Sequence, residues 1–377
     1  MKNVLLYLGK FPGYGSDIDG GSILAKQLID SLKIKCNLNV VFIRKNGETY
    51  EDNLVNSIRY VEYKNATDNK FKRRLANLDT NRKAIGDYYQ YDIIITAHVS
   101  KFFGFDVLET DFWKRTILFP MFCTSSYIKA GEIVPQLYTS LEKVVIQNVF
   151  KIITPSMQEK IDLLNDYNCT KSKIFVINRG VSPLFKFKKR RYFDSIIKIV
   201  YIASIKPQKN NIDALKLLRI LNRSDLKFEM NFVCTIQDVF LYNYMLKYIQ
   251  TNNLSDYVKF HIGLSQKELS LLLQNMDINI SVSNWETFGR GIYEGITAGL
   301  PTFIFNHLEV IKELCDSNLG VSYSNTINEM SEEIIKTCKN IDKYLEKSDA
   351  LITLAEKVSY EKEQQLLVES ILNENNI

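Results

Sequence analysis

The stretch that decides the fold is INISVSNWETFGRGIYEGITAGLPT, residues 278–302. Its first six residues carry apolar side chains at alternate positions and predict a buried strand. Polar and glycine residues over 284–291 follow, and they predict a tight loop because a buried strand would not accept them. Ile292 and Ile296 then have helical spacing, and the Gly-Leu-Pro sequence at 299–301 predicts the end of that helix. The chain next enters another apolar strand.

Two glutamates belong to this unit, Glu286 on the loop and Glu294 within the helix. The loop follows the carboxyl end of its strand, where ligands bind in open α/β folds, and N–H groups of the helix start point there too. The pair does not suit a glycoside hydrolase. Eight residues of helix rise about 12 Å, whereas the two carboxyl groups of hydrolases lie about 5 to 9.5 Å apart. We expect the glutamates to hold two separate parts of one extended ligand.

Strands and helices alternate along all 377 residues. The expected strands are 4–9, 39–43, 57–63, 92–96, 116–119, 151–154 and 173–178 in a first run, then 196–203, 228–233, 258–262, 278–282 and 302–305 in a second. Two such runs predict two doubly wound parallel-sheet domains. We place the first domain at 1–184, a basic linker at 185–195 and the second domain at 196–355. Helical spacing over 351–372 predicts a C-terminal helix, assigned to 356–377. Either domain is open as its packing partner, and one possibility is that it packs back on the first domain.

The composition is that of an ordinary globular protein, with 46% hydrophobic and 24% charged residues. No apolar run reaches the length of a membrane span, and the N-terminus predicts a strand rather than a signal peptide. Six cysteines are scattered without paired spacing, which favours reduced thiols in a cytoplasmic protein and no zinc site.

The net charge of +5 is concentrated in two clusters. One comprises Lys70, Lys72, Arg73 and Arg74, and the other comprises Lys186, Lys188, Lys189, Arg190 and Arg191. Such clusters contact nucleic acid or anionic membrane surfaces in some proteins. The simpler interpretation is a solvated loop and a solvated linker, because no nucleic-acid-binding module accompanies them. We therefore expect no nucleic acid partner.

The sequence Glu286-Thr287-Phe288-Gly289, with Glu294 and the Ala-Gly-Leu-Pro segment at 298–301, resembles the E-x7-E signature of the retaining GT-B glycosyltransferase family (group 1 type). The similarity is specific over 278–310 and looser elsewhere. It implies an α/β fold of GT-B architecture, with two Rossmann-like domains facing across a cleft. It also implies a hexosyltransferase-type enzyme of EC class 2.4. Such an enzyme moves a sugar from a nucleotide-diphosphate sugar, with a UDP-sugar as the expected donor.

The resemblance implies roles for the residues of this motif. The family's second glutamate binds the ribose of the donor, which implies that role for Glu294. Its first glutamate and the neighbouring backbone hold the transferred sugar and the phosphate, which implies donor contacts by Glu286, Thr287, Phe288, Gly289 and Arg290. Both roles are chemically sensible, since a carboxylate accepts hydroxyl hydrogen bonds and a helix start binds phosphate.

The family also places an arginine and a lysine after the first strand of the second domain, where they bind the diphosphate. Lys209 matches this lysine, but Ser204 occupies the arginine position. This departure leaves two interpretations. Either Lys206 or Arg290 supplies the missing positive charge, or the leaving group is stabilised less than usual.

In the first domain, Gly20 and Gly21 resemble the family's glycine loop near the donor phosphate or the acceptor. Their spacing is not that of the dinucleotide fingerprint. The triplet Asp17-Ile18-Asp19 matches the metal signature of the other glycosyltransferase fold, and we interpret it as chance because it follows the first strand of a different architecture. We expect no metal, with basic groups acting in its place. His98 follows the expected strand 92–96, and a role beside the reacting sugar and a purely structural role both stay open.

No side chain is placed as a nucleophile, so the resemblance implies the family's front-face mechanism, with Glu286, Lys209 and His98 as the expected catalytic residues. Residues 119–127 stand where relatives have an acceptor loop, which suits a glycan, lipid-linked or protein acceptor in bacterial surface glycan (polysaccharide) synthesis. We expect a cytoplasmic protein, compatible with peripheral contact at the inner face of the membrane. Two alternatives are a non-catalytic partner subunit, favoured by Ser204, and a nucleotide-sugar epimerase of the same fold.

Overall fold

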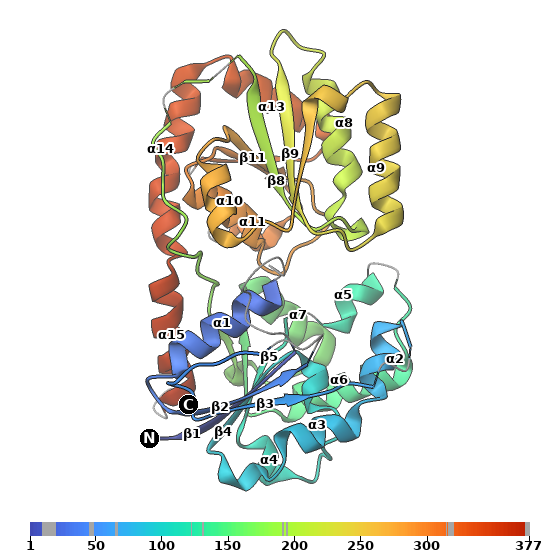
Figure 1. The fold of residues 1–377 in the computed structure, drawn as a ribbon, viewed down its shortest axis with the longest axis vertical. Helices are drawn as coiled ribbons and strands as arrows, with labels where there is room; N and C mark the ends of the chain where they lie inside the picture. Colours follow the sequence, from blue (N-terminus) through green and yellow to red (C-terminus); the bar gives the residue numbers. More distant parts are fainter. Residues whose placement is uncertain are drawn as a thin grey trace. The chain divides into compact units, whose positions relative to one another are not determined.

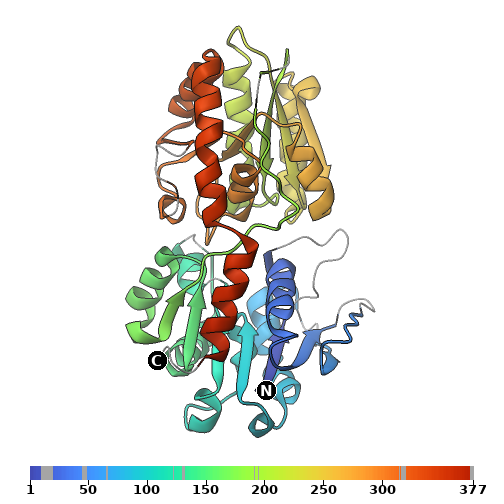
Figure 2. The same cartoon turned by 90° about the vertical axis from the view of Figure 1, so that its left-hand side faces the viewer.

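The computed structural model describes residues 1–9, 20–44, 49–64, 67–121, 123–129, 132–190, 192–193, 195–313, 315 and 320–373. The chain divides into two compact units. Of the described residues, those within 1–9, 20–178 and 361–373 form unit 1, and those within 179–360 form unit 2. Each unit is a parallel sheet between two layers of helices (Figure 1 and Figure 2).

Unit 1 contains a seven-stranded sheet in the order β3-β2-β1-β4-β5-β6-β7, and all its strand pairs are parallel. The strands are β1 (Asn3–Leu8), β2 (Asn37–Ile43), β3 (Ser57–Val61), β4 (Ile93–Ala97), β5 (Thr116–Phe119), β6 (Lys151–Thr154) and β7 (Ile174–Val176). Strands β4, β5 and β6 are buried along their whole length. Burial of both faces explains their nearly continuous apolar sequences, because helices cover a parallel sheet on both sides.

Helices α1 (Gly20–Leu32) and α15 (Tyr360–Leu372) cover one face of this sheet, where Leu28 and Leu367 share a core with β1 and β2 (Figure 2). The other face packs against α2 (Lys70–Leu75), α3 (Leu78–Ile85), α4 (Thr110–Trp113), α6 (Gln136–Asn148) and α7 (Met157–Tyr167). Short helices at 88–90, 99–102 and 171–173 and α5 (Thr124–Lys129) complete the unit.

Unit 2 contains a six-stranded parallel sheet in the order β10-β9-β8-β11-β12-β13. The strands are β8 (Ile197–Ile202), β9 (Phe228–Cys234), β10 (Val258–Ile262), β11 (Ile278–Ser281), β12 (Thr302–Phe305) and β13 (Val321–Ser324). Helices α8 (Asn211–Leu221), α9 (Val239–Thr251) and α13 (Ile327–Cys338) pack on one face. Helices α10 (Gln266–Leu273), α11 (Arg290–Thr297), α12 (Glu309–Lys312) and α14 (Ile341–Lys357) pack on the other (Figure 1).

The structure contains all twelve strands predicted from the sequence, each within two residues of its expected ends, and adds β13. A capping box of Ser265 and Glu268 begins α10. The C-terminal tail differs from the prediction of one helical run, because α14 begins at Ile341 and the helix is interrupted before α15. At this interruption the N–H of Val181 donates to the carbonyl of Val358 at 2.8 Å.

The basic segment 185–190 is not the solvated linker that its charges predict. Arg190 is buried, and its guanidinium donates to backbone carbonyls of unit 2, whereas Lys186, Lys188 and Lys189 are exposed. An arginine can be buried when its donors find acceptors, as both terminal nitrogens of Arg190 do. The interpretation was therefore wrong for this residue. Arg191 lies outside the described residues.

Within the described ranges, no helix combines the length and the apolar character needed to cross a membrane. All six cysteines are free.

Candidate active site

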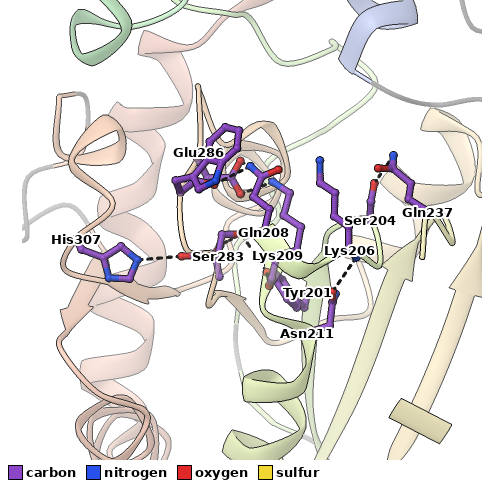
Figure 3. Close-up of polar contacts among 12 residues, drawn as sticks. Tyr201, Ser204, Lys206, Gln208, Lys209, Asn211, Gln237, Ser283, Glu286 and His307 are labelled. Atoms are coloured by element: carbon purple, nitrogen blue, oxygen red, sulfur yellow. Dashed lines mark hydrogen bonds and ion pairs between the residues drawn. The ribbon is translucent and has the colours of Figure 1, made fainter. Parts of the chain in front are cut away.

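The candidate site of unit 2 lies where the strand order reverses, between the adjacent strands β8 and β11. Both strands are parallel, so the loops after Ile202 and Ser281 leave from the same edge of the sheet. Open α/β sheets bind ligands outside the carboxyl ends of their strands at this reversal. The loop after β8 contains Lys209, and the loop after β11 contains Glu286 (Figure 3).

Lys209 and Glu286 form a bidentate ion pair, which Figure 3 shows in the middle of the site. The Nζ atom of Lys209 lies 2.6 Å from Oε1 and 2.7 Å from Oε2 of Glu286. The two side chains are 15% and 11% exposed. Limited contact with water strengthens such a pair, because solvent screening is reduced. The predicted sugar-binding carboxylate and the predicted phosphate-binding cation are therefore direct partners.

Backbone hydrogen bonds tie the two loops together. The N–H of Asn284 donates to the carbonyl of Gln208 at 2.9 Å. In return, the side chain of Gln208 donates to the carbonyl of Trp285 at 2.9 Å. The bonded residues directly precede Lys209 and Glu286 in the sequence, so these bonds fix the position of one loop against the other beside the ion pair.

A buried tyrosine supports the loops from below. The hydroxyl of Tyr201, on β8, donates to the carbonyl of Lys209 and lies 3.1 Å from Oγ of Ser283. Burial raises the pKa of Tyr201, so the hydroxyl keeps its proton and stays a donor. His307, after β12, contacts the carbonyl of Ser283 through Nε2 at 3.1 Å. Three neighbouring strands thus fix the backbone that carries the ion pair.

Ser204, at the position of the family arginine, belongs to a neutral hydrogen-bonded group. Its Oγ lies 3.0 Å from Oγ1 of Thr235 and accepts from the side chain of Gln237 at 3.4 Å. Lys206, two residues further on, has its backbone N–H 3.3 Å from Oδ1 of Asn211. Figure 3 shows the side chain of Lys206 extending to the same side as Ser204 and Gln237.

Glycines bring α11 directly against the sheet at this edge. Gly289, the N-cap of α11, has a φ of +83°, a backbone angle that residues other than glycine rarely adopt. A Cβ atom on Gly291 would lie 2.5 Å from the carbonyl oxygen of Ile202, the last residue of β8. A Cβ on Gly295 would lie 2.4 Å from the side chain of Asn279 on β11. The start of α11 therefore lies against the end of β8, with its first N–H groups at the same edge as the ion pair.

Phe288 and Thr287 differ in exposure within this loop. Phe288 is buried, and its ring stacks on Tyr293 with the ring centres 4.5 Å apart. A side chain in that position supports the loop, so a donor contact of Phe288 would come from its backbone. Thr287 is half-buried.

Glu294, in the middle of α11, is buried. Burial raises the pKa of its carboxyl group to about 7, while nearby Arg290 and a hydrogen bond from Gln266 oppose this rise. The side chain of Gln266, at the start of α10, lies 3.3 Å from Oε1 of Glu294. Arg290 itself donates to the carbonyl of Gly180 at 3.3 Å. A carboxyl group with such a pKa changes its charge close to neutral pH.

The remaining predicted site residues belong to unit 1. His98 directly follows β4 with a φ of 97°, and its Nδ1 accepts from the N–H of Ser100 at 3.1 Å. Burial, together with Arg74 and Lys101, lowers the pKa of His98, so its ring is neutral. Gly20 and Gly21 are the first residues of α1. The triplet at 17–19 lies outside the described residues, and no group of three or more His, Cys, Asp or Glu that could bind a metal occurs among the described ones.

Sequence reasoning missed several residues that shape the site: Tyr201, Gln208, Gln266, Ser283 and His307. Each acts through a partner between 24 and 82 residues away, apart from the contact of Tyr201 with the nearby Lys209. Periodicity and local motifs carry no signal for such distant partners.

Comparison with known families adds to this geometry. Residues 185–358 match the family model described as "Glycosyl transferases group 1". This segment is therefore similar to the group 1 glycosyltransferases. The match contains the whole candidate site of unit 2, and it confirms the predicted enzyme class. No curated protein sequence matches the chain.

Solved glycosyltransferase structures are similar to the chain over nearly its whole length. Sucrose-phosphate synthase from Thermosynechococcus elongatus has a TM-score of 0.81 at 13% identity, with 98% of each chain covered. WaaG, a glycosyltransferase involved in lipopolysaccharide biosynthesis, has a TM-score of 0.77 at 12% identity, covering 98% of this chain and 100% of WaaG. HepE from Anabaena in complex with UDP-glucose has a TM-score of 0.73 at 14% identity, covering 98% and 99%. The predicted GT-B fold is thereby confirmed.

Proposed function

We propose that the chain is a retaining glycosyltransferase that moves a sugar from a UDP-sugar to a hydroxyl of a glycan, glycolipid or protein in bacterial surface glycan synthesis. The observation that carries the proposal is the Lys209–Glu286 ion pair at the β8/β11 reversal, inside the segment that is similar to the group 1 glycosyltransferases. The structure of HepE with UDP-glucose supports a uridine diphosphate donor.

The two partners of the ion pair take different parts of the donor. Lys209 stabilises the negative charge of the leaving diphosphate, and Glu286 positions the transferred sugar through its hydroxyls. Before the donor binds, each partner compensates the charge of the other, so neither side chain is left as a buried lone charge. Lys206 supplies the second positive charge in place of the arginine that Ser204 replaces, since it extends from the same loop (Figure 3).

The acceptor hydroxyl attacks from the face on which the diphosphate leaves, and the departing phosphate oxygen takes its proton. His98 contributes as a neutral ring, because its Nδ1 accepts from Ser100 and the proton is then on Nε2. That N–H is a hydrogen-bond donor for a sugar hydroxyl. Gly20 and Gly21, at the start of α1, approach the donor phosphate with their backbone. The proposal requires no metal.

Glu294 is proposed to accept hydrogen bonds from the ribose hydroxyls, which gives donor binding a pH dependence. The ionised carboxylate is the better acceptor, and with a pKa of about 7 it is mostly protonated at pH 6. Affinity for UDP-glucose is therefore expected to be about tenfold lower at pH 6 than at pH 8. Titration calorimetry measures this dependence, and Glu294→Gln should abolish it. The exposed Glu309→Gln on α12 is the control, and an unchanged pH profile in Glu294→Gln would contradict the assignment.

The same pKa has the opposite effect on stability. The folded state retains the proton of Glu294 up to about pH 7, whereas the unfolded chain loses it near its ordinary value of 4.5. The folded state thus binds more protons between these values, so the stability of the protein without donor falls as pH rises through this window and levels off above it.

The function is tested by measuring binding and hydrolysis of UDP-, GDP- and ADP-sugars. We expect one UDP-sugar to bind and to be hydrolysed slowly without acceptor, and Glu294→Ala to weaken this binding. Interconversion of the donor sugar into its epimer would identify an epimerase instead. Binding without turnover, even with glycan acceptors, would identify a non-catalytic subunit, the alternative that Ser204 favours.

We also propose that unit 1 contacts the inner face of a membrane through a surface formed by α2, α5 and the start of α6. Ile128, Ile133 and Leu137 there are 53%, 92% and 57% exposed. Lys70 joins these elements, since it pairs with Glu132 at 2.8 Å and lies 3.8 Å from the ring centre of Tyr127. Lys72, Arg73 and Arg74 add positive charge on α2. Exposed aliphatic residues beside basic ones suit an anionic bilayer.

The membrane contact predicts vesicle binding that depends on these aliphatic residues. Ile133→Asp is expected to weaken binding to phosphatidylglycerol-containing vesicles about tenfold in a flotation assay, because it replaces the apolar side chain that would enter the bilayer with a negative charge. Leu108→Asp is the matched control. Leu108 is 84% exposed in the same unit but stands beside Asp106, Glu109 and Asp111. Equal vesicle binding by the two variants would contradict this surface. So would equal binding of the wild-type protein to phosphatidylglycerol-containing vesicles and to vesicles of phosphatidylcholine alone.

A further inference from the structure

Arg190 makes contacts that its place in a basic segment does not predict. Its Nη1 donates to the carbonyl of Met276 at 2.7 Å and lies 3.3 Å from that of Gln274. Its Nη2 donates to the carbonyl of Ala298 at 2.8 Å and to that of Leu273 at 3.2 Å. One buried guanidinium therefore serves four backbone carbonyls.

Three of these four carbonyls lie at the C-terminal ends of two helices. Leu273 and Gln274 end α10, and Ala298 is the C-cap of α11. Helix ends carry unsatisfied carbonyls and the negative end of the helix dipole, so a positive group stabilises them. A planar guanidinium can bind both ends at once, whereas a lysine has a single nitrogen.

The neighbours of Arg190 in the chain join the same two helix ends. Lys188 donates through Nζ to the carbonyl of Gln274 at 2.7 Å, and its backbone N–H lies 3.4 Å from the carbonyl of Ala298. Gln274 donates back to the carbonyl of Lys186 at 2.8 Å. Segment 186–190 is thus a clamp across α10 and α11.

The same two helices meet again at the proposed ribose site. Gln266 opens α10 and contacts Glu294 of α11. Glu294 is one helical turn before Ala298, and the N–H of Ala298 donates to the Glu294 carbonyl at 3.1 Å. The contacts that hold the C-terminal ends of α10 and α11 together therefore also influence the burial of Glu294 and its contact with Gln266.

We propose that Arg190 is a positioning residue for donor binding: by clamping the ends of α10 and α11, it holds Glu294 against Gln266. Arg190 touches no donor itself. This role rests on the proposed function, in which Glu294 binds the ribose. Arg290, on the same helix, is the charged group that lowers the pKa of Glu294. Replacing Arg190 does not remove Arg290.

The test compares Arg190→Met, Arg190→Lys and Lys189→Met in the full-length chain. Lys189 is the matched control, because its side chain is 75% exposed. Its ion pair with the half-exposed Asp349, at 3.4 Å, is a solvent-exposed pair of the kind that contributes little. UDP-glucose affinity is measured between pH 5.5 and 8.5 at a temperature at which each variant is folded, and Tm is measured alongside.

We expect Arg190→Met to weaken UDP-glucose binding about tenfold and to move the midpoint of its pH dependence to lower pH, because water reaches Glu294. Arg190→Lys should give intermediate values, and Lys189→Met should match the wild type. A lower Tm with unchanged affinity and midpoint would overturn the proposal and leave Arg190 a purely structural residue. If Arg190→Met does not fold, the affinity of Arg190→Lys for UDP-glucose and the midpoint of its pH dependence decide in the same way. Absence of UDP-glucose binding in the wild type would instead refute the proposed function.

Discussion

Replacing Lys209 by methionine is expected to lower sugar transfer and donor hydrolysis about 100- to 1,000-fold, the usual effect of removing one group that stabilises transition-state charge. The variant also leaves Glu286 without the partner that holds both of its oxygens. Breaking a largely buried ion pair typically destabilises a protein by about 3–5 kcal/mol. Steady-state kinetics and thermal unfolding of the same preparation measure the two effects.

Two further variants separate the effect of Lys209→Met on catalysis from its effect on protein stability. Lys216→Met on α8 is the control, because Lys216 is exposed and its ion pair with Asp213, at 2.8 Å, lies on the surface of the same helix. Lys209→Met combined with Glu286→Gln should regain most of the lost stability, since no lone carboxylate remains, but no activity. Near-normal turnover by Lys209→Met would show that Lys209 does not act on the diphosphate.

Gly291→Ala is expected to have the second-largest effect, on both stability and donor binding. The added Cβ would lie 2.5 Å from the carbonyl oxygen of Ile202, so α11 must move away from β8. Forcing an extra carbon into a packed interior costs about 1–3 kcal/mol, which lowers Tm by roughly 3 to 10 °C in a unit of this size. The shift also displaces the loop start and Glu294, and UDP-glucose affinity should fall with it.

The control for this helix is Thr297→Ala, which removes atoms near the C-terminal end of α11 and leaves its contact with β8 intact. We expect it to keep wild-type affinity. Titration calorimetry measures the UDP-glucose affinity of both variants, and differential scanning calorimetry measures their Tm. A Gly291→Ala protein with wild-type Tm and affinity would mean that α11 has room beside β8 that the structure does not show.

Much of the fold follows from local sequence patterns. Alternating apolar residues predict β11, and glycine with proline predicts the end of α11, because burial and backbone geometry act within a few residues there. Strand β13 was missed, since Val321-Ser322-Tyr323-Ser324 is short and half polar. The interruption between α14 and α15 was missed as well. There the N–H of Val181 donates to the carbonyl of Val358, a contact between distant residues that no local pattern encodes.

The candidate site divides in the same way. The motif residues Glu286 and Glu294 are recognisable because their spacing along the chain is fixed by the loop and the helix. The direct pairing of Lys209 with Glu286 could not be read from the sequence, since 77 residues separate the partners. Arg190 shows the limit most clearly. Its basic neighbours indicate a solvated segment, but four backbone carbonyls at least 83 residues away along the chain accept its hydrogen bonds and allow its burial.

The central claim is that the chain transfers a sugar with retention, and the anomeric configuration of its product tests this most directly. The enzyme is given the UDP-α-sugar that it binds, and the released or transferred sugar is followed by proton NMR before the free anomers equilibrate. The account predicts that the α-anomer forms first, and that Lys209→Met suppresses its formation. Initial formation of the β-anomer would contradict it.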